Sequence, residues 1–335
     1  MQIYGIDLSK EKFDVCYIDG RGIERMKEVK NHLKGISKFI EELPKGAYLC
    51  AEHTGCYGDL LVFICNQMHV PISLVPGYTI KHSLGLVRGK SDPIDSRKMK
   101  EFGVRFFDKL RLTEYHSEEI AELRELHALR SQFVKSRKLL LTSENGRKHL
   151  PFQSINVNKH TKNALDTLTQ EIKDIEHEII SIILNSKELS KSFNLATSIS
   201  GVGPVITIEL IIKTGNFKVI DTAKKASSYA GVCPFPNSSG NMMGKSKTSH
   251  LADKRLKSLL YMGAKAAVKH NPEFRLYFQR KTLEGKHYFL IMNNISNKMV
   301  RTIYSVIKNN KPYDKNYSQR DPREKLIKSS EKNVA

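Results

Sequence analysis

The sequence opens with Gln2-Ile-Tyr-Gly-Ile-Asp-Leu8, and Phe13-Asp-Val-Cys-Tyr-Ile-Asp19 follows after a short polar stretch. In both stretches β-branched and aromatic residues recur between polar turn residues, which is typical of two short strands joined as a hairpin. Strand-like and helical patterns then alternate, with a helix near 35–43, a strand at 47–53, a helix at 57–69 and a strand at 71–75. Strands that begin as a meander and then alternate with helices predict an α/β domain with a mixed sheet.

Helical periodicity replaces this pattern from about residue 117. Two runs of apolar residues recur at steps of three and four, apart from one step of seven between Phe133 and Leu140, as a helix seam requires. They are Leu126, Leu129, Phe133 and Leu140, followed by Leu165, Leu168, Ile172, Ile175, Ile179 and Ile182. Because Pro151-Phe152 separates the runs, we predict two long antiparallel helices that turn there. Their seams can pair within the chain or with another subunit, and the sequence leaves both arrangements open.

The rest of the chain is basic and predominantly helical in pattern. Helices are predicted at 204–213, 222–230, 253–270, 273–283 and 288–309, with a loop rich in Gly, Pro, Ser and Lys at 232–250. The whole pattern predicts four parts: an α/β domain at 1–112, a long helical region at 113–187, an all-α domain at 188–310 and a basic disordered tail at 311–335.

The net charge of +20 and the pI of about 9.6 are the most informative global properties. A surface this basic attracts a polyanion, so nucleic acid is the expected partner. A membrane is not expected, because the charge is not gathered in one amphipathic helix and no apolar run reaches the ~18 residues that span a bilayer. The first residues carry no secretory signal, so we expect a soluble protein of the cytoplasm.

The cysteines are odd in number and contain no C-x-x-C pair. This argues against a disulfide framework and against a structural zinc site. We therefore expect reduced core thiols at Cys16, Cys50, Cys56, Cys65 and Cys233.

Four acidic residues stand where predicted strands end or a helix begins. Asp7 and Glu52 each end a strand, whereas Asp92 and Asp95 are three residues apart at a helix start and share one side of it. Such a cluster suits phosphodiester cleavage, because divalent cations stabilise the attacking and leaving oxygens and carboxylates suit Mg²⁺. A plainer interpretation also fits: Asp92 can cap the helix before Pro93, and Asp95 can favour the helix dipole.

Three motifs carry a resemblance to a known family. Tyr4-Gly-Ile-Asp7-Leu-Ser-Lys10, Glu52-His-Thr-Gly55 and Arg88-Gly-Lys-Ser-Asp92-Pro-Ile-Asp95-Ser-Arg97 resemble, in order and spacing, the DEDD-type transposases of the insertion sequence 110 family. The resemblance continues into the C-terminal domain and covers most of the chain. It implies an RNase-H-like fold similar to the RuvC resolvase, and two Mg²⁺ ions, or Mn²⁺, held by Asp7, Glu52, Asp92 and Asp95. Nucleic-acid contacts by Arg88, Lys90 and Arg97 belong to the same expectation.

A short glycine motif, Gly201-Val-Gly203-Pro204, precedes an apolar helix. Glycines at such a position let backbone N–H groups at the helix start approach a DNA phosphate. A tight packing turn between two helices explains the same residues equally well.

The loop that contains Ser238-Ser239-Gly240 is rich in small and cationic residues. A serine that attacks phosphorus must be accessible, and its transition state requires fixed positive charge nearby. Lys245, Lys247, Lys254 and Arg255 are the candidates for that charge. By chemistry alone such a segment is more often an ordinary loop.

The family resemblance changes the interpretation of this loop. Family members carry a proline-containing segment, then a Ser-Gly pair and a basic stretch that leads into a helix, and Ser239-Gly240 occupies that place. The resemblance implies that Ser239 forms a phosphoserine link to DNA, with Ser238 as the second choice. Thr248-Ser-His-Leu-Ala-Asp253 departs from the Lys- and Gly-rich pattern of the family, so the residues after Gly244 have less defined roles.

The resemblance also implies partners. Family members act as homo-oligomers, dimers or tetramers, with a composite catalytic site, on double-stranded donor and target DNA. Insertion-sequence members are guided by a structured bridge RNA, whereas the related Piv-type invertases flip a DNA segment. Such a protein is expected in a bacterial or archaeal cytoplasm, at the nucleoid.

Two other classes of function use the same sequence features differently. A nonenzymatic nucleic-acid-binding or architectural protein would use the acids only as helix caps and would need no metal. A Holliday-junction resolvase would share the acidic site but would not need Ser239.

Overall fold

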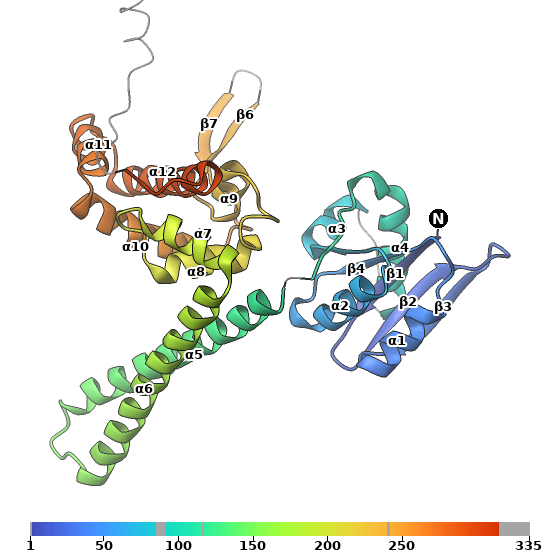
Figure 1. Cartoon of the computed structure of the whole chain (residues 1–335), viewed down its shortest axis with the longest axis horizontal. Coiled ribbons are helices and arrows are strands. Elements are labelled where there is room, and N and C mark those ends of the chain that lie inside the picture. The colour runs from blue at the N-terminus through green and yellow to red at the C-terminus, as the bar shows by residue number, and fades with distance from the viewer. Residues whose placement is uncertain (1, 85–91, 116, 240–241, 315–335) are drawn as a thin grey trace, which may run out of the picture. The chain divides into compact units, whose positions relative to one another are not determined.

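The computed structural model describes residues 2–84, 92–115, 117–239 and 242–314. The chain divides into two compact units, Met1–His116 and Ser117–Ala335 (Figure 1), and each is described by itself. The predicted tail lies largely outside the described residues. No described helix combines the length and apolar character that crossing a membrane would require.

The N-terminal unit is built on a five-stranded sheet in the order β3-β2-β1-β4-β5. Its strands are β1 (Gln2–Leu8), β2 (Lys12–Ile18), β3 (Glu24–Lys30), β4 (Ala47–Glu52) and β5 (Ile72–Val75). β1, β2 and β3 are antiparallel neighbours, whereas β1, β4 and β5 are parallel. The predicted mixed sheet is therefore confirmed. Strand β3 was not predicted, because its sequence is mostly charged and its side chains are mostly exposed.

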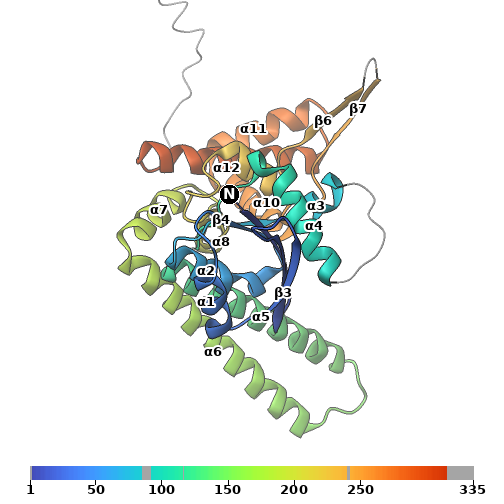
Figure 2. The same ribbon diagram turned by 90° about the vertical axis from the view of Figure 1, so that its right-hand side faces the viewer.

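Helices cover both faces of this sheet, and strand alternation assigns residues to each face (Figure 2). One face packs on α1 (Leu33–Glu41) and α2 (Asp59–Gln67) through even-numbered β1 residues such as Tyr4 and Ile6. The other face packs beneath α3 (Gly77–Ser83) and α4 (Asp92–Arg105). Two 3₁₀ turns, Gly55–Gly58 and Phe107–Lys109, complete the unit.

Gly5 determines how closely α4 can lie on β1. A side chain at this position would put its Cβ 2.1 Å from the backbone N of Lys100 and 2.3 Å from the carbonyl O of Ser96. Because backbone atoms cannot move aside as a flexible side chain can, only glycine permits this crossing. Gly103, further along α4, also lies close to β1, since a Cβ there would lie 2.7 Å from the Cγ2 of Ile3.

In the second unit, α5 (Glu118–Arg147) and α6 (Ile155–Asn185) form a long antiparallel pair, called the arm below (Figure 1). The two helices pack against each other within the chain, which is one of the two arrangements left open by the sequence. Ser154 caps α6 by accepting a hydrogen bond from the N–H of Val157. The buried side chains of α6 are Leu165, Ile175, Ile179 and Ile183.

The remaining helices form a compact bundle with one apolar core, which also includes Ile120 and Leu123 from the base of α5. They are α7 (Lys187–Thr197), α8 (Pro204–Thr214), α9 (Ala223–Tyr229), α10 (Lys254–His270), α11 (Pro272–Leu283) and α12 (Tyr288–Asn309). Helix α8 is the most buried of them, as its apolar sequence predicts.

The prediction of an all-α C-terminal domain with a loop at 232–250 needs one correction. Part of that loop forms a two-stranded hairpin of β6 (Phe235–Ser239) and β7 (Met242–Lys247), which projects from the bundle in both views (Figures 1 and 2). The sequence places only Gly240-Asn241 between the strands, a residue pair that tight hairpin connections favour. The abundance of Gly, Pro and Ser outweighed this local signal in the prediction.

The cysteines of the described residues are all free thiols. Cys16, Cys50 and Cys65 are buried, and burial raises the pKa of Cys50 and of Cys65 to about 12. They are core thiols, as predicted. Cys56 is exposed and Cys233 is half-buried, so the prediction is wrong for Cys56.

Candidate active site and nucleic-acid interface

Asp7 and Glu52 lie side by side on adjacent parallel strands. The register pairs Gly5 with Cys50 and Ile6 with Ala51, so Asp7 and Glu52 are the next residues along β1 and β4. Strand alternation puts both on the α4 face of the sheet, together with Gly5 and Cys50. Both side chains are half-buried. Two of the four predicted acids are thus brought to the carboxyl end of one sheet face.

A glycine leaves room for the Glu52 carboxylate. Gly77 begins α3, and a Cβ at this position would lie 2.0 Å from Oε1 of Glu52. Any other residue would therefore push the carboxylate away from its place. Gly77 was not predicted as a site residue, although the Pro76-Gly77 pair directly after β5 marks a turn at the end of that strand.

Helix α4 runs toward the same end of the sheet. Its C-terminal half, at Gly103, lies against Ile3, and its middle turn, from Ser96 to Lys100, lies against Gly5. The residues before Ser96 therefore extend toward the carboxyl end of β1. Asp95 is half-buried and its Oδ1 lies 2.7 Å from the Nζ of Lys98.

Asp92 is the first residue of α4, but its side chain lies outside the described part of the structure. Among the described residues, no three His, Cys, Asp or Glu side chains form a group that could hold a metal ion. In the described residues, Asp7 and Glu52 therefore lie close together, and the N-terminal end of α4 points toward them.

Of the three basic residues predicted to contact nucleic acid beside this site, the structure describes only Arg97. Arg97 and Lys100 both form ion pairs with Glu24 of β3, and the Arg97 Nη2 to Glu24 Oε1 distance is 2.5 Å. The hydrogen bonds from Lys100 and Arg97 hold the pKa of Glu24 below its usual value. Arg97 thus helps fix α4 to the sheet edge. Arg88 and Lys90 lie outside the described residues.

In the second unit, the glycine motif before α8 has a clear packing role. Gly201 has a φ of 93°, and a Cβ there would lie 2.5 Å from the carbonyl O of Gly263 in α10. This close approach favours the packing-turn interpretation for Gly201. Gly203 is the N-cap of α8, and no atom within 4 Å would meet a Cβ there.

The two candidate serines lie at the end of β6, directly before the hairpin connection. Their backbones pair with β7, Ser238 opposite Met243 and Ser239 opposite Met242. Lys245 and Lys247 belong to β7, and the side chains of these serines and lysines lie outside the described part of the structure. Gly240 also lies outside it. Lys254, the first residue of α10, is exposed.

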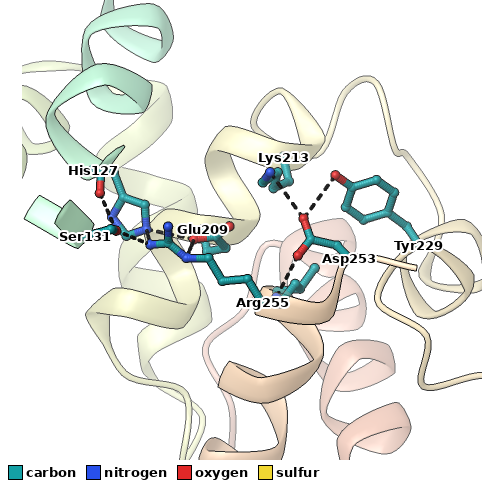
Figure 3. Close-up of polar contacts among 8 residues, drawn as sticks. His127, Ser131, Glu209, Lys213, Tyr229, Asp253 and Arg255 are labelled. Carbon is teal, nitrogen blue, oxygen red and sulfur yellow. Dashed lines mark hydrogen bonds and ion pairs between the residues drawn. The ribbon is translucent and has the colours of Figure 1, made fainter. Parts of the chain in front are cut away.

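Arg255, which was predicted to contact nucleic acid, belongs to a partly buried polar network within the protein (Figure 3). Its Nε lies 3.0 Å from Oε2 of Glu209, and its Nη2 donates a 2.6 Å hydrogen bond to the hydroxyl of Ser131. His127 completes the network, with its Nε2 2.8 Å from Oε2 of Glu209 and 2.7 Å from Arg255 Nη2. The network links α5, α8 and α10.

Glu209 and His127 were not predicted from the sequence. The Glu209 side chain is only 2% exposed, so its charge needs a partner inside the protein. A single carboxylate within Ile208-Glu209-Leu210-Ile211-Ile212 was the available signal, because acidic residues are almost never buried alone.

Asp253 forms a second polar group at the start of α10 (Figure 3). It accepts a 2.9 Å hydrogen bond from the N–H of Leu256, and its Oδ2 lies 3.2 Å from Lys213 and 3.4 Å from the Tyr229 hydroxyl. Burial raises the pKa of Asp253, but the Leu256 N–H and the Lys213 charge outweigh burial, so the pKa lies below its usual value. Asp253 therefore caps α10 as a charged carboxylate.

Comparison with known proteins gives matches in both units. A family model described as transposase, for the DEDD transposases of IS110, matches residues 4–150, and the model described as "Transposase IS116/IS110/IS902 family" matches residues 194–279. The chain belongs to the IS110 family of transposases. As a member of this family it is an enzyme of DNA recombination. The four predicted acids fall in the first matched range, and Ser239 and Arg255 fall in the second.

The relatives of this transposase include both a DNA-inverting protein and another transposase. The pilin gene-inverting protein of Moraxella bovis is 26% identical over 321 residues, covering 93% of this chain and 97% of that protein. The transposase of insertion sequence element IS1111A from Coxiella burnetii is 22% identical over 302 residues, covering 81% and 79%. The IS116 protein of Streptomyces clavuligerus is 24% identical over 150 residues, covering 42% and 38%.

Proposed function

We propose that this transposase cuts and rejoins DNA with a metal-binding acidic site and a serine nucleophile, Ser239. The observation that carries the proposal is the placement of Asp7 and Glu52 at the ends of adjacent parallel strands, with α4 directed toward them. An RNase-H-like fold, similar to RuvC, agrees with the five-stranded mixed sheet and its two helical faces. Under this proposal the N-terminal domain is the catalytic domain that holds the metal, and the helical C-terminal domain carries the serine.

The acidic residues fit a divalent cation. Their donors are carboxylate oxygens alone, which Mg²⁺ and Mn²⁺ prefer, and Gly77 leaves room for the Glu52 carboxylate. Asp7, Glu52, Asp92 and Asp95 would hold the metal, which would stabilise the charge on phosphate oxygens when bound. The first two are fixed by the sheet, and the Gly5 contact fixes the helix that carries the others.

The serine step transfers a DNA strand to the protein. The Ser239 Oγ forms a bond to phosphorus, the bond from phosphorus to the outgoing strand end breaks, and the hydroxyl proton is passed to that departing oxygen. The resulting phosphoserine ester keeps the energy of the broken bond for rejoining. The position of Ser239 at the end of a projecting hairpin supports this role, because an attacking hydroxyl must reach the DNA.

The partners follow from the same proposal. They are double-stranded donor and target DNA, a structured bridge RNA that pairs with them, and further copies of the chain in a dimer or tetramer. Because base pairing would then select the sequence, the protein needs mainly backbone contacts, and its charge of +20 suits them. We place its work in the cytoplasm of a bacterium or archaeon, at the nucleoid.

Inversion of a DNA segment is the second candidate reaction. The observation in its favour is the match to the pilin gene-inverting protein, which spans nearly the full length of both chains. The two reactions share the same bond-breaking chemistry and differ in the arrangement of the DNA sites. Inspecting the DNA that flanks the gene distinguishes them, because transposition requires element ends and a noncoding segment for the bridge RNA.

The experiment that tests the chemistry is capture of a covalent protein–DNA adduct. The wild-type protein, incubated with Mg²⁺ and its DNA, is digested and the DNA-linked peptide is identified by mass spectrometry. The expected peptide contains Ser239, the Ser239→Ala protein gives none, and Ser238→Ala still gives it. An adduct that persists in Ser239→Ala would exclude this serine, and unimpaired cleavage by Asp7→Ala would exclude the metal site.

A further inference from the structure

The arm is charged very unevenly along its length. Its distal part, residues 130–163, contains one acidic residue, Glu144, and eight basic ones: Arg130, Lys135, Arg137, Lys138, Arg147, Lys148, Lys159 and Lys162. The proximal parts of the same helices, 118–129 and 164–185, contain nine Asp or Glu and only two Lys or Arg. Positive charge is therefore concentrated at the end of the arm that lies away from the bundle (Figure 1).

The arginines of the distal part hold the two helices together. Arg130 lies 2.5 Å from Glu176, Arg137 donates to the hydroxyl of Thr169 and Arg147 donates to the hydroxyl of Thr161. These contacts cross from α5 to α6 and use the guanidinium groups for packing the arm. The arginines are half-buried and are not the groups that a partner would meet first.

The lysines of the distal part are in a different position. Lys135, Lys138, Lys159 and Lys162 are exposed and form no ion pair with any described residue. Each pair is spaced by three residues and so shares one side of its helix. Four ammonium groups on two adjacent helices, with Glu144 as the single acidic residue of the distal part, leave a positive surface that the protein itself does not neutralise.

The two lysine pairs lie at different levels along the arm. The Arg137–Thr169 contact marks the level of Lys135 and Lys138, and the Arg147–Thr161 contact marks the level of Lys159 and Lys162. Ten residues of α5 separate these contacts, which corresponds to about 15 Å of helix. This distance is close to the width of about 12 Å of the major groove of DNA, so the pairs can reach phosphates on its two sides.

We infer that the distal arm is a binding surface for the phosphate backbone of double-stranded DNA. The four lysines supply the contacts, and the acidic proximal arm repels phosphate and so confines the DNA to the distal part. The inference depends on the family's DNA substrate but assigns no role to the acidic site or to Ser239. DNA is chosen over RNA because the family membership establishes DNA as the substrate.

Charge reversal in the full-length protein tests this inference. The arm variant carries Lys135→Glu, Lys138→Glu, Lys159→Glu and Lys162→Glu. A matched control carries the same four changes at exposed lysines elsewhere in the second unit: Lys173, Lys187, Lys191 and Lys224. Both proteins have the same net charge, so any difference between them reports position. Fluorescence anisotropy measures binding of a labelled DNA duplex of arbitrary sequence over a series of salt concentrations, and circular dichroism checks folding.

We expect the arm variant to bind the duplex at least about tenfold more weakly than the control at low salt, with a slope of log K against log salt smaller by about 3. Equal affinities of the two variants would overturn the inference. A loss confined to a matching RNA duplex would overturn it as well, because it would identify RNA as the partner. These are binding measurements, so they stand even if no covalent serine adduct forms.

Discussion

At the residue scale, the need for glycine at position 5 can be measured as a change in stability. Gly5→Ala would drive a methyl group into the backbone of α4 at Lys100 and Ser96. We expect a loss of about 3 kcal/mol in the free energy of unfolding of the N-terminal unit, as for severe overpacking. Denaturant titration followed by circular dichroism measures it.

Gly20→Ala is the matched control for this change. No atom within 4 Å would meet the added Cβ, and the backbone there is not in the left-handed region. Its unfolding free energy should stay within about 0.5 kcal/mol of the wild type. Equal effects of the two substitutions would show that the close crossing of α4 over β1 is not a constraint.

Gly77 tests the position of the Glu52 carboxylate rather than stability. Gly77→Ala would place a Cβ 2.0 Å from Glu52 Oε1 and displace that carboxylate from its place beside α3. If Glu52 holds a metal, the concentration of Mg²⁺ needed for half-maximal DNA cleavage should rise about tenfold or more. Gly146→Ala, in open space on α5, should leave it unchanged. A Gly77→Ala protein with normal Mg²⁺ dependence would argue against Glu52 as a ligand.

Arg255 gives a third prediction, about the buried Glu209 charge. Arg255→Ala removes a partner 3.0 Å from a carboxylate that is almost fully buried. We expect a loss of about 2 kcal/mol of unfolding free energy, less than for a fully buried pair because the Arg255 side chain is 42% exposed. Lys254→Ala, its exposed neighbour, should change stability by less than about 0.5 kcal/mol. The same small effect for both would mean that His127 alone satisfies Glu209.

At the scale of single elements, the start of α10 should respond to pH. Asp253→Asn keeps an oxygen for the cap but removes the charge near Lys213. Because the folded pKa of Asp253 is lowered, its charge stabilises the fold above the unfolded pKa of about 3.9. That advantage over Asn, about 1 kcal/mol, is lost as the pH falls through the lower folded pKa. Unfolding of both proteins, measured from pH 7 downward, should show the difference shrink; a constant difference would contradict the assignment.

Elements with strong local patterns were predictable, and those defined by pairing were not. The sequence identifies β1, β2, β4 and β5, because their apolar residues form short strand-like runs. Strand β3 has no such apolar run, because most residues of its Glu24–Lys30 sequence are charged. Only its pairing with β2 identifies it as a strand. The β6–β7 hairpin was not predicted for a related reason: its Gly, Pro and Ser content is typical of a loop, and only the pairing of the two strands identifies it as a hairpin.

At the scale of the whole molecule, the acidic site could be anticipated only in part. Strand ends predicted that Asp7 and Glu52 meet, and the β1–β4 register brings them together. The contact of Gly5 with α4 could not be predicted, because it joins segments many residues apart without a local signature. For Glu209 the apolar surroundings in the sequence indicate burial, but they do not identify His127 and Arg255 as its partners. Ser239 depends on family resemblance rather than on its surroundings.

The proposed oligomer gives a prediction at the same scale. Asp7 and Ser239 lie in different compact units, each with its own core. We expect Asp7→Ala and Ser239→Ala to be inactive alone and to regain strand exchange when mixed, because each supplies what the other lacks. A mixture of Asp7→Ala and Glu52→Ala should stay inactive, since both lesions are in one site. Failure of the first mixture to recover would contradict sharing of sites between subunits.

The Arg255 network has a mechanical consequence. It ties the base of α5, through His127 and Ser131, to α10, whose first turn follows the strand after the serines. A force that DNA exerts on the far end of the arm would therefore be transmitted through Arg255 to the start of α10. The β6–β7 hairpin, which directly precedes α10 in the chain, would then become more rigid. Bound DNA should accordingly slow amide hydrogen exchange in β6 and β7 of the wild type, and cutting the linkage with Arg255→Ala should abolish that remote response.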